Sequence, residues 1–184
     1  MLIDITLTIT PQMLEDAKKN QNKALEGHLG THFDVMDKEF PLEYTKRKGL
    51  IFDVTNVEDR DICSIDVDLN KVEKDMFVIF YNGFSEKEPY GTPVYYKEHP
   101  QLSDELIENL LGKGVSIIGL DFAGIRRPPE HTPKDQYCAE KGVFIIENLR
   151  NLKKLLNVND FTVNTYPLNC QGITGLPCRV VCEI

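Results

Sequence analysis

The amino-acid sequence predicts a mixed α/β fold, and three kinds of pattern support this. Continuous apolar runs such as residues 76–81 are typical of strands that are covered on both faces. Residues 103–113 carry apolar side chains at helical spacing and lie between two such runs. Shorter stretches alternate apolar and polar residues, as strands with one exposed face do. Strands interleaved with helices in this way predict a mixed central sheet.

Length and composition are those of a globular domain. The 184 residues are 41% hydrophobic and 27% charged, and we expect residues 1–184 to form a single domain. The formal net charge of -8 argues against nucleic acid and against an anionic membrane surface as partners. No apolar run approaches the ~20 residues that a membrane span needs.

The N-terminus and the cysteines indicate a cytoplasmic protein. Residues 1–10 lack a basic region and a long apolar core, so no signal peptide is expected. The five cysteines are an odd number without framework spacing, and free thiols in a reducing cytoplasm are the expectation. Cys178 and Cys182 could share a strand face and bind a metal ion, although buried free cysteine is common in protein cores.

The first half of the chain contains predicted strands and one short helix. Residues 3–9 alternate as a half-buried strand, and the polar run 12–22 can hold a helix. Residues 50–54 indicate a second strand, and residues 65–69 alternate again. Residues 76–81 are apolar throughout, which predicts a strand that is buried on both faces.

The second half opens with a long excursion and a capped helix. Residues 84–100 carry three prolines and are expected to form an ordered loop of the kind that is often functional. Ser103 is the expected N-cap of a helix that ends at Lys113 before Gly114. The remaining predicted elements are strands at 115–120, 143–146, 161–166 and 178–184, and helices at 134–141 and 152–156.

Three good metal ligands, His28, His32 and Asp34, fall at even spacing around Gly30. In an extended backbone, side chains two residues apart share a face, so all three would point the same way. A helix fits less well, because Asp34 would turn off the face of the two histidines and glycine disfavours a helix. The same extended face would continue to Lys38.

Two further residues could complete a metal site. His131 lies in a proline-rich loop after the predicted strand that ends before Asp121, and Glu147 ends the apolar strand 143–146, where a carboxylate needs a cation or hydrogen-bond donors. Imidazole and carboxylate ligands suit Zn²⁺, Mn²⁺ or Fe²⁺. A surface histidine, a solvated glutamate and a polar network in a structural core are the alternative interpretations.

The run H-x-G-T-H-x-D at residues 28–34 is followed by further motif-like segments in a fixed order. Together they resemble the cyclase family of metal-dependent hydrolases, which includes bacterial kynurenine formamidase and isatin hydrolase. The other matching segments are a strand end at 81–84 similar to Thr-Gly-Trp, Asp121, His131, the Glu-Asn-Leu at 147–149, the Pro-Leu at 167–168, and the Gly-x-Pro-x-Arg-Val at 175–180.

The resemblance implies a fold, a metal site and an assembly. His28, His32 and Asp34 match the family's first metal ligands, and Asp34, His131 and Glu147 match the ligands of a second ion where two are bound. The implied cofactor is therefore one or two divalent ions, zinc or manganese. The implied fold is the swivelling β/β/α type, and the implied assembly is a homodimer or homotetramer.

The sequence departs from the family at the position of its general acid/base. The family's run continues D-x-P-x-H, whereas this chain has Met36 and Lys38 at the last two conserved positions. Lysine normally stays protonated near neutrality, where histidine titrates. Lys38 could serve as a base if burial and a dication lowered its pKa, could hold a substrate carboxylate or oxyanion, or could face solvent in a protein that has lost this chemistry.

These observations predict a metal-dependent hydrolase with a small-molecule substrate. The expected reaction is attack of metal-activated water on a non-peptide amide, such as an N-formyl arylamine like N-formylkynurenine, or a cyclic amide. Tyr90, Tyr95 and Tyr96 could line the substrate pocket, and His99 is expected to be exposed. The alternative is a metal- or small-molecule-binding protein without turnover on the same fold, because Lys38 replaces the base.

Overall fold

Four parallel strands form the centre of the sheet in the computed structural model of the protein, which describes residues 1–19 and 26–184. Antiparallel strands extend this centre on both sides, in the order β1-β9-β7-β3-β4-β5-β6-β2-β8. The strands are β1 (Leu2–Asp4), β2 (His32–Asp34), β3 (Lys46–Asp53), β4 (Phe77–Tyr81), β5 (Ile117–Leu120), β6 (Phe144–Glu147), β7 (Thr162–Thr165), β8 (Gly175–Pro177) and β9 (Val180–Glu183). The prediction of a mixed α/β fold is confirmed.

The central strands are apolar throughout because they separate two hydrophobic cores. Along β4, Phe77 and Ile79 belong to one cluster of buried side chains, whereas Val78 and Phe80 belong to the other. A pleated strand sends successive side chains to opposite faces, so a strand between two cores needs apolar residues at every position. This is the physical reason for the unbroken run that the sequence shows at residues 76–81.

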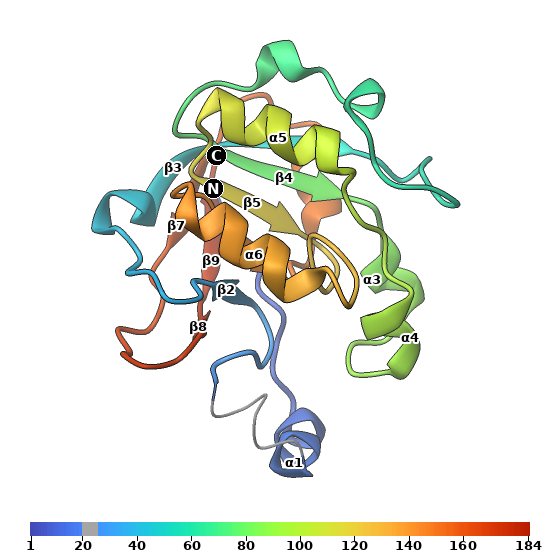
Figure 1. The fold of residues 1–184 in the computed structure, drawn as a ribbon, viewed down its shortest axis with the longest axis vertical. Helices are drawn as coiled ribbons and strands as arrows, with labels where there is room; N and C mark the ends of the chain where they lie inside the picture. The colour runs from blue at the N-terminus through green and yellow to red at the C-terminus, as the bar shows by residue number, and fades with distance from the viewer. Residues whose placement is uncertain (20–25) are drawn as a thin grey trace.

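Helices α5 (Asp104–Lys113) and α6 (His131–Glu140) cover one face of the parallel strands (Figure 1). The Ser103 hydroxyl accepts a hydrogen bond from the backbone N–H of Leu106 at 3.2 Å, and this N-cap begins α5 where the sequence predicted. Gly114 ends the helix with φ of 70°, a conformation that glycine adopts without strain. The predicted helix and both of its ends are therefore confirmed.

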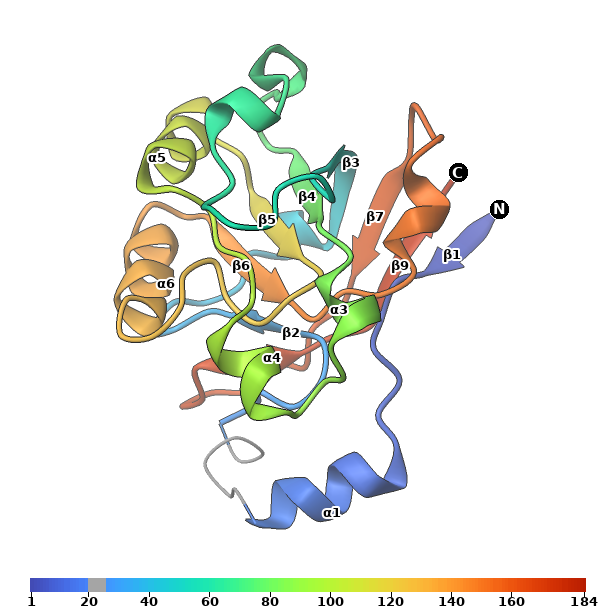
Figure 2. The same cartoon turned by 90° about the vertical axis from the view of Figure 1, so that its right-hand side faces the viewer.

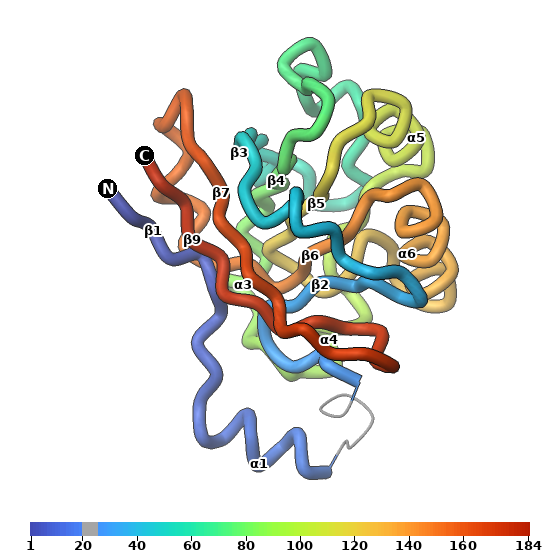
Figure 3. The backbone as a smooth tube through the Cα atoms, turned by 90° about the vertical axis from the view of Figure 1, so that its left-hand side faces the viewer, coloured from blue at the N-terminus to red at the C-terminus, as the bar shows by residue number. Residues whose placement is uncertain are grey.

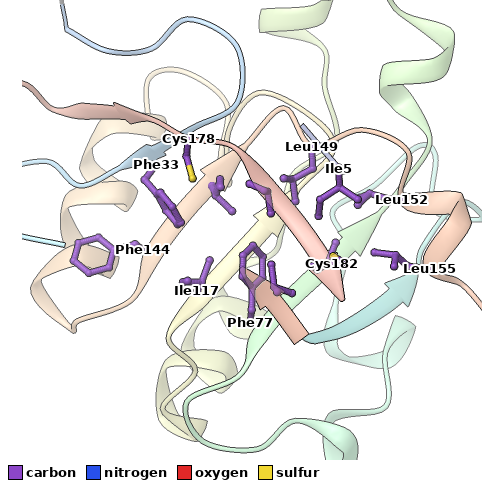
Figure 4. Close-up of a cluster of buried hydrophobic side chains, with 14 of the residues drawn as sticks. Ile5, Phe33, Phe77, Ile117, Phe144, Leu149, Leu152, Leu155, Cys178 and Cys182 are labelled. Atoms are coloured by element: carbon purple, nitrogen blue, oxygen red, sulfur yellow. The ribbon is translucent and has the colours of Figure 1, made fainter. Parts of the chain in front are cut away.

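The antiparallel strands β1, β7 and β9 lie across the opposite face, so the layers are sheet, sheet and helix (Figures 2 and 3). Their inward side chains, among them Ile3 and Val163, meet Phe77 and Ile117 of the parallel strands in one buried cluster. Figure 4 shows this cluster, to which Phe33 of β2 also contributes. This layering agrees with the β/β/α fold that the family resemblance implied.

Shorter helical segments connect these elements. Helix α1 stands apart from the layers, and α3 and α4 follow β4 as the excursion predicted for residues 84–100 (Figure 1). No helix within residues 1–19 and 26–184 is long and apolar enough to cross a bilayer. The helical segments are α1 (Pro11–Lys19), α3 (Phe84–Lys87) and α4 (Pro93–Lys97), together with 3₁₀ turns at Leu42–Thr45, Ser64–Asp66, Leu69–Lys71 and Leu152–Leu155.

Several local predictions need correction. Residues 65–69 form no strand; two 3₁₀ turns occupy this region, and Ile65 is 87% exposed. The turn forms because the Asp66 carboxylate accepts a hydrogen bond from the backbone N–H of Cys63 at 2.8 Å, which competes with strand pairing. The first strand ends at Asp4 rather than Ile9, and the helix expected at 152–156 is a 3₁₀ turn.

Three further predictions concern ends of elements or exposure. The helix expected at 12–22 begins at Pro11 and is described as far as Lys19, and its last predicted residues, 20–22, lie outside the described residues. The helix expected at 134–141 begins three residues earlier, at His131. His99 was expected to be exposed, but it is buried and stacks on Phe122, with ring centroids 5.8 Å apart.

The Ser103 cap gives a test of this part of the fold. Replacing Ser103 by alanine removes the acceptor for the Leu106 N–H, and we expect it to lower the free energy of unfolding by about 1 kcal/mol. Urea unfolding monitored by circular dichroism measures the change. Ser103→Asp is the matched control, because aspartate caps as well as serine and should keep the stability of the wild type. Equal loss in both variants would contradict this role of the cap.

Candidate metal centre

Strand β2 places His32 and Asp34 on the helix-covered side of the sheet. It pairs antiparallel with β6, with His32 opposite Glu147, and with β8 on its other side. Phe33 points into the core shared with β1 and β9, so its two neighbours in the strand must point the other way. On that side α6 packs beside β6 (Figure 2).

His28 joins this group through a turn. The strand covers only His32–Asp34, and the chain reaches it through Gly27 and Gly30, whose φ angles are 83° and 75°. The His28 Nδ1 atom lies 3.1 Å from His32 Nε2 and 3.1 Å from Asp34 Oδ1. The three residues therefore meet as predicted, but the extended backbone proposed for all of residues 28–34 is wrong.

Helix α6 brings the remaining predicted ligand, and one more carboxylate, to the same place. The His131 Nε2 atom lies 3.0 Å from Glu147 Oε1 and 3.1 Å from Asp135 Oδ2. Glu147 Oε2 in turn lies 3.7 Å from His32 Nε2. Asp135 was not predicted as a ligand, because the helix was expected to begin at Lys134 and His131 to lie in a loop before it. A helix that includes both residues puts them on one face at i, i+4.

The cluster fits a cation better than it fits a closed hydrogen-bond network. Within the described residues, three buried carboxylate oxygens have no hydrogen-bond donor: Asp34 Oδ2, Asp135 Oδ1 and Glu147 Oε1. The last of these lies 3.0 Å from His131 Nε2, a contact that is an ion pair when the imidazole is protonated. Buried acceptors without donors are costly, and a metal ion would satisfy them. Two sets offer ligand atoms within 4.8 Å of one another: His28, His32 and Asp34, and Asp34, His131 and Asp135.

The charges in the cluster favour a cation. Burial by itself lowers the pKa of His32, but Asp34 and Glu147 outweigh it and raise that pKa to about 9. Burial also lowers the pKa of His131, and Glu147 and Asp135 raise it to about 12. Burial raises the pKa of Asp135 to about 8. Without an ion the cluster therefore holds protons, and binding of a divalent cation would release them.

A buried hydrogen-bond network sets the orientation of the His32 ring. The Nδ1 atom of His32 lies 2.9 Å from the Gly30 carbonyl oxygen, which also accepts a hydrogen bond from Asn148 Nδ2 at 2.9 Å. The Asn148 Oδ1 atom accepts a hydrogen bond from the Tyr95 hydroxyl at 2.8 Å. Because the carbonyl holds the proton on Nδ1, the Nε2 atom is left to face the carboxylates.

The structure also places the lysine, tyrosines and cysteines that the sequence singled out. The Lys38 side chain is 37% exposed and its Nζ atom lies 3.0 Å from Asp37 Oδ1. Tyr95 is buried, and the Tyr90 hydroxyl accepts a hydrogen bond from the backbone N–H of Gly30 at 3.0 Å. Cys178 and Cys182 are free thiols in the core.

Access to the cluster is through two of its histidines. The side chains of His28 and His131 are 25% and 29% exposed, whereas His32 and the carboxylates are almost fully covered. Two cavities of about 450 and 350 Å³ lie elsewhere, one beside Asp121 and Arg150 and the other beside His99 and Arg127. None of the clustered residues lines either cavity.

Comparison with known proteins identifies the family. Residues 3–126 match the family described as "Putative cyclase", which is more than half of the chain, so the chain belongs to this family. This confirms the resemblance found in the sequence. The comparison with curated proteins gives no match.

Solved structures share the fold over most or nearly all of the chain. A potential metal-dependent hydrolase with cyclase activity superimposes with a TM-score of 0.72 at 22% identity, covering 99% of this chain and 96% of the other. A structure described as a predicted metal-dependent hydrolase from Bacillus stearothermophilus gives 0.69 at 20% identity, covering 99% and 97%. Isatin hydrolase A from Labrenzia aggregata gives 0.70 at 17% identity, covering 83% and 72%.

The network behind His32 can be tested through the Tyr95 hydroxyl. Tyr95→Phe leaves the buried Asn148 Oδ1 without this donor, and we expect it to lower the free energy of unfolding by about 1–3 kcal/mol. Urea unfolding measures the effect. Tyr137→Phe is the control, because that hydroxyl contacts Glu108 at the surface and its loss should change the stability by less than about 0.5 kcal/mol. Similar values for the two variants would show that the network does not stabilise the site.

Proposed function

We propose that this protein is a metal-dependent hydrolase that cleaves a non-peptide amide. The observation that carries the proposal is the buried group of histidines and carboxylates, in which three carboxylate oxygens have no donor from residues 1–19 or 26–184. Membership of the cyclase family and the likeness to metal-dependent hydrolases support it. The proposal includes a cytoplasmic location and a homodimer or homotetramer.

The residues of the cluster have separate roles in this proposal. His28, His32 and Asp34 hold one divalent ion, zinc or manganese, and His131 and Glu147 hold a second together with Asp34. When bound, such an ion would polarise the amide carbonyl and lower the pKa of a water molecule. Asp34 belongs to both groups and fixes their spacing, and the exposed edges of His28 and His131 mark the side on which a substrate arrives.

The family and its chemistry support a class of substrate. Among the similar structures are isatin hydrolases, one of them bound to the product analogue thioisatinate, and isatin is a cyclic amide. We propose a cyclic amide or an N-formyl arylamine as the substrate here, with N-formylkynurenine as the representative of the second class. An arylformamidase of this kind would act in tryptophan catabolism.

Metal content is the first test of this proposal. We expect purified protein to contain one or two equivalents of a transition metal by elemental analysis. His32→Ala should lower the metal affinity at least tenfold, because His32 is buried beside the carboxylates of Asp34 and Glu147. His99→Gln is the control, since this histidine lies outside the cluster and should leave the metal content unchanged. Protein that neither contains metal nor takes up added zinc or manganese would overturn the proposal.

A non-catalytic binding protein is the second candidate, and the placement of Lys38 favours it. In the described part of the chain the Lys38 ammonium pairs with Asp37. The loop itself lies near the site, because Asp37 also accepts a hydrogen bond from Gln136, the residue next to Asp135, at 2.8 Å. A histidine at position 38 would put an imidazole in this loop with a pKa near neutrality.

Lys38→His separates the two candidates. If the site lacks only a base, this variant should raise kcat for N-formylkynurenine by about 100-fold or more, in the range that general acid–base catalysis supplies. The measurement is the absorbance change on deformylation, with metal content determined in parallel. Lys48→His, at an exposed position in β3, is the control and should not raise the rate. Absence of turnover in both metal-loaded variants would favour the binding protein.

A further inference from the structure

We propose that Asp135 is a metal ligand and that it divides the cluster into two chemically unequal cation centres. This inference rests on the proposed function and adds a ligand to it. The first centre has two imidazoles and one carboxylate from β2 and the turn before it. The second is richer in carboxylates, because α6 contributes Asp135 as well as His131.

Burial is the first argument for this role. Asp135 is 2% exposed, and its Oδ1 atom has no hydrogen-bond partner in residues 1–19 and 26–184. A carboxylate in the middle of a helix gains nothing from such a position, since an isolated buried charge is costly. The pairing of Oδ2 with His131 at 3.1 Å satisfies only one of its two oxygens. The other oxygen needs a proton or a cation.

The direction of approach distinguishes a ligand from a residue that only orients His131. A carboxylate that orients a metal-binding histidine bonds to the ring nitrogen that does not bind the metal. Here Asp135 and Glu147 both approach the same nitrogen, Nε2, at 3.1 and 3.0 Å. The other nitrogen, Nδ1, lies on the side of Gly124. Asp135, Glu147 and His131 Nε2 therefore face one another and could bind the same metal ion.

Asp34 is shared by the two centres. It offers an oxygen to His28 and His32, and it also lies within 4.8 Å of the ligand atoms of His131 and Asp135. The second centre therefore has Asp34 and Asp135 with a single imidazole, and Glu147 adds a third carboxylate 3.0 Å from His131 Nε2. Carboxylate oxygens suit Mn²⁺ and Mg²⁺, whereas imidazoles suit Zn²⁺. We expect the first centre to prefer zinc and the second to prefer manganese.

Isothermal titration of metal-stripped protein tests this assignment. Wild-type protein titrated with MnCl₂ after one equivalent of ZnCl₂ should bind one further equivalent of manganese. Asp135→Asn should keep the zinc site and weaken manganese binding at least tenfold, and His28→Ala should weaken zinc binding instead. Electron paramagnetic resonance of bound Mn²⁺ gives an independent readout of the second centre. Asp104→Asn is the control, because Asp104 is an exposed aspartate that pairs with α6 through Lys134.

The outcomes separate this inference from the proposed function. If Asp135→Asn binds both ions as tightly as the wild-type protein does, or if the wild-type protein binds only zinc, the role of Asp135 is overturned. The proposal of a metal-dependent hydrolase would still stand. A wild type that binds neither ion would overturn both. If Asp135→Asn does not fold by circular dichroism, Asp135→Ser replaces it with the same expected loss of manganese. Asp135→Glu, which keeps the carboxylate, should recover part of the manganese affinity.

Discussion

The antiparallel pairing of β2 with β6 is the contact on which the candidate site depends. It sets His32 opposite Glu147, and it fixes which face each residue of β2 occupies. A shift of one residue in this register would send His32 and Asp34 into the hydrophobic core and Phe33 into the cluster. Phe33 is fully buried against the core side chains of the neighbouring strands. Its packing on one face of the sheet therefore keeps His32 and Asp34 on the other face.

Helix α6 adds two of the clustered side chains to those that the strands position. Helix α6 packs beside β6, and its first two turns carry His131 and Asp135 at a spacing that points both toward the sheet. Burial there disfavours charge, yet the structure gathers three carboxylates and three histidines in one place. Such a group is stable only if positive charge is present, as protons on the imidazoles or as metal ions. The surrounding fold supplies the geometry, and protons or metal ions would supply the positive charge.

The sequence predicted those features that depend on local pattern. The apolar runs located β4, β5 and β6, and Ser103 located the start of α5. Motif spacing found five of the six clustered residues. The spacing did not identify Asp135, because Pro133 and the polar residues around it do not show where α6 begins. His99 was also misjudged, since its burial against Phe122 depends on contacts that no local pattern reveals.

The strands that flank β2 come from distant parts of the chain. Its partners are β6, at residues 144–147, and β8, at residues 175–177, so each pairing closes a loop of more than a hundred residues. Contacts at such separation form late because the chain must first give up the entropy of the intervening segment. A nascent chain that stops short of residue 175 has the H-x-G-T-H-x-D run but only one of the two strands that hold it. The centre therefore depends on both long-range pairings, and a chain that lacks β8 would hold β2 on one side only.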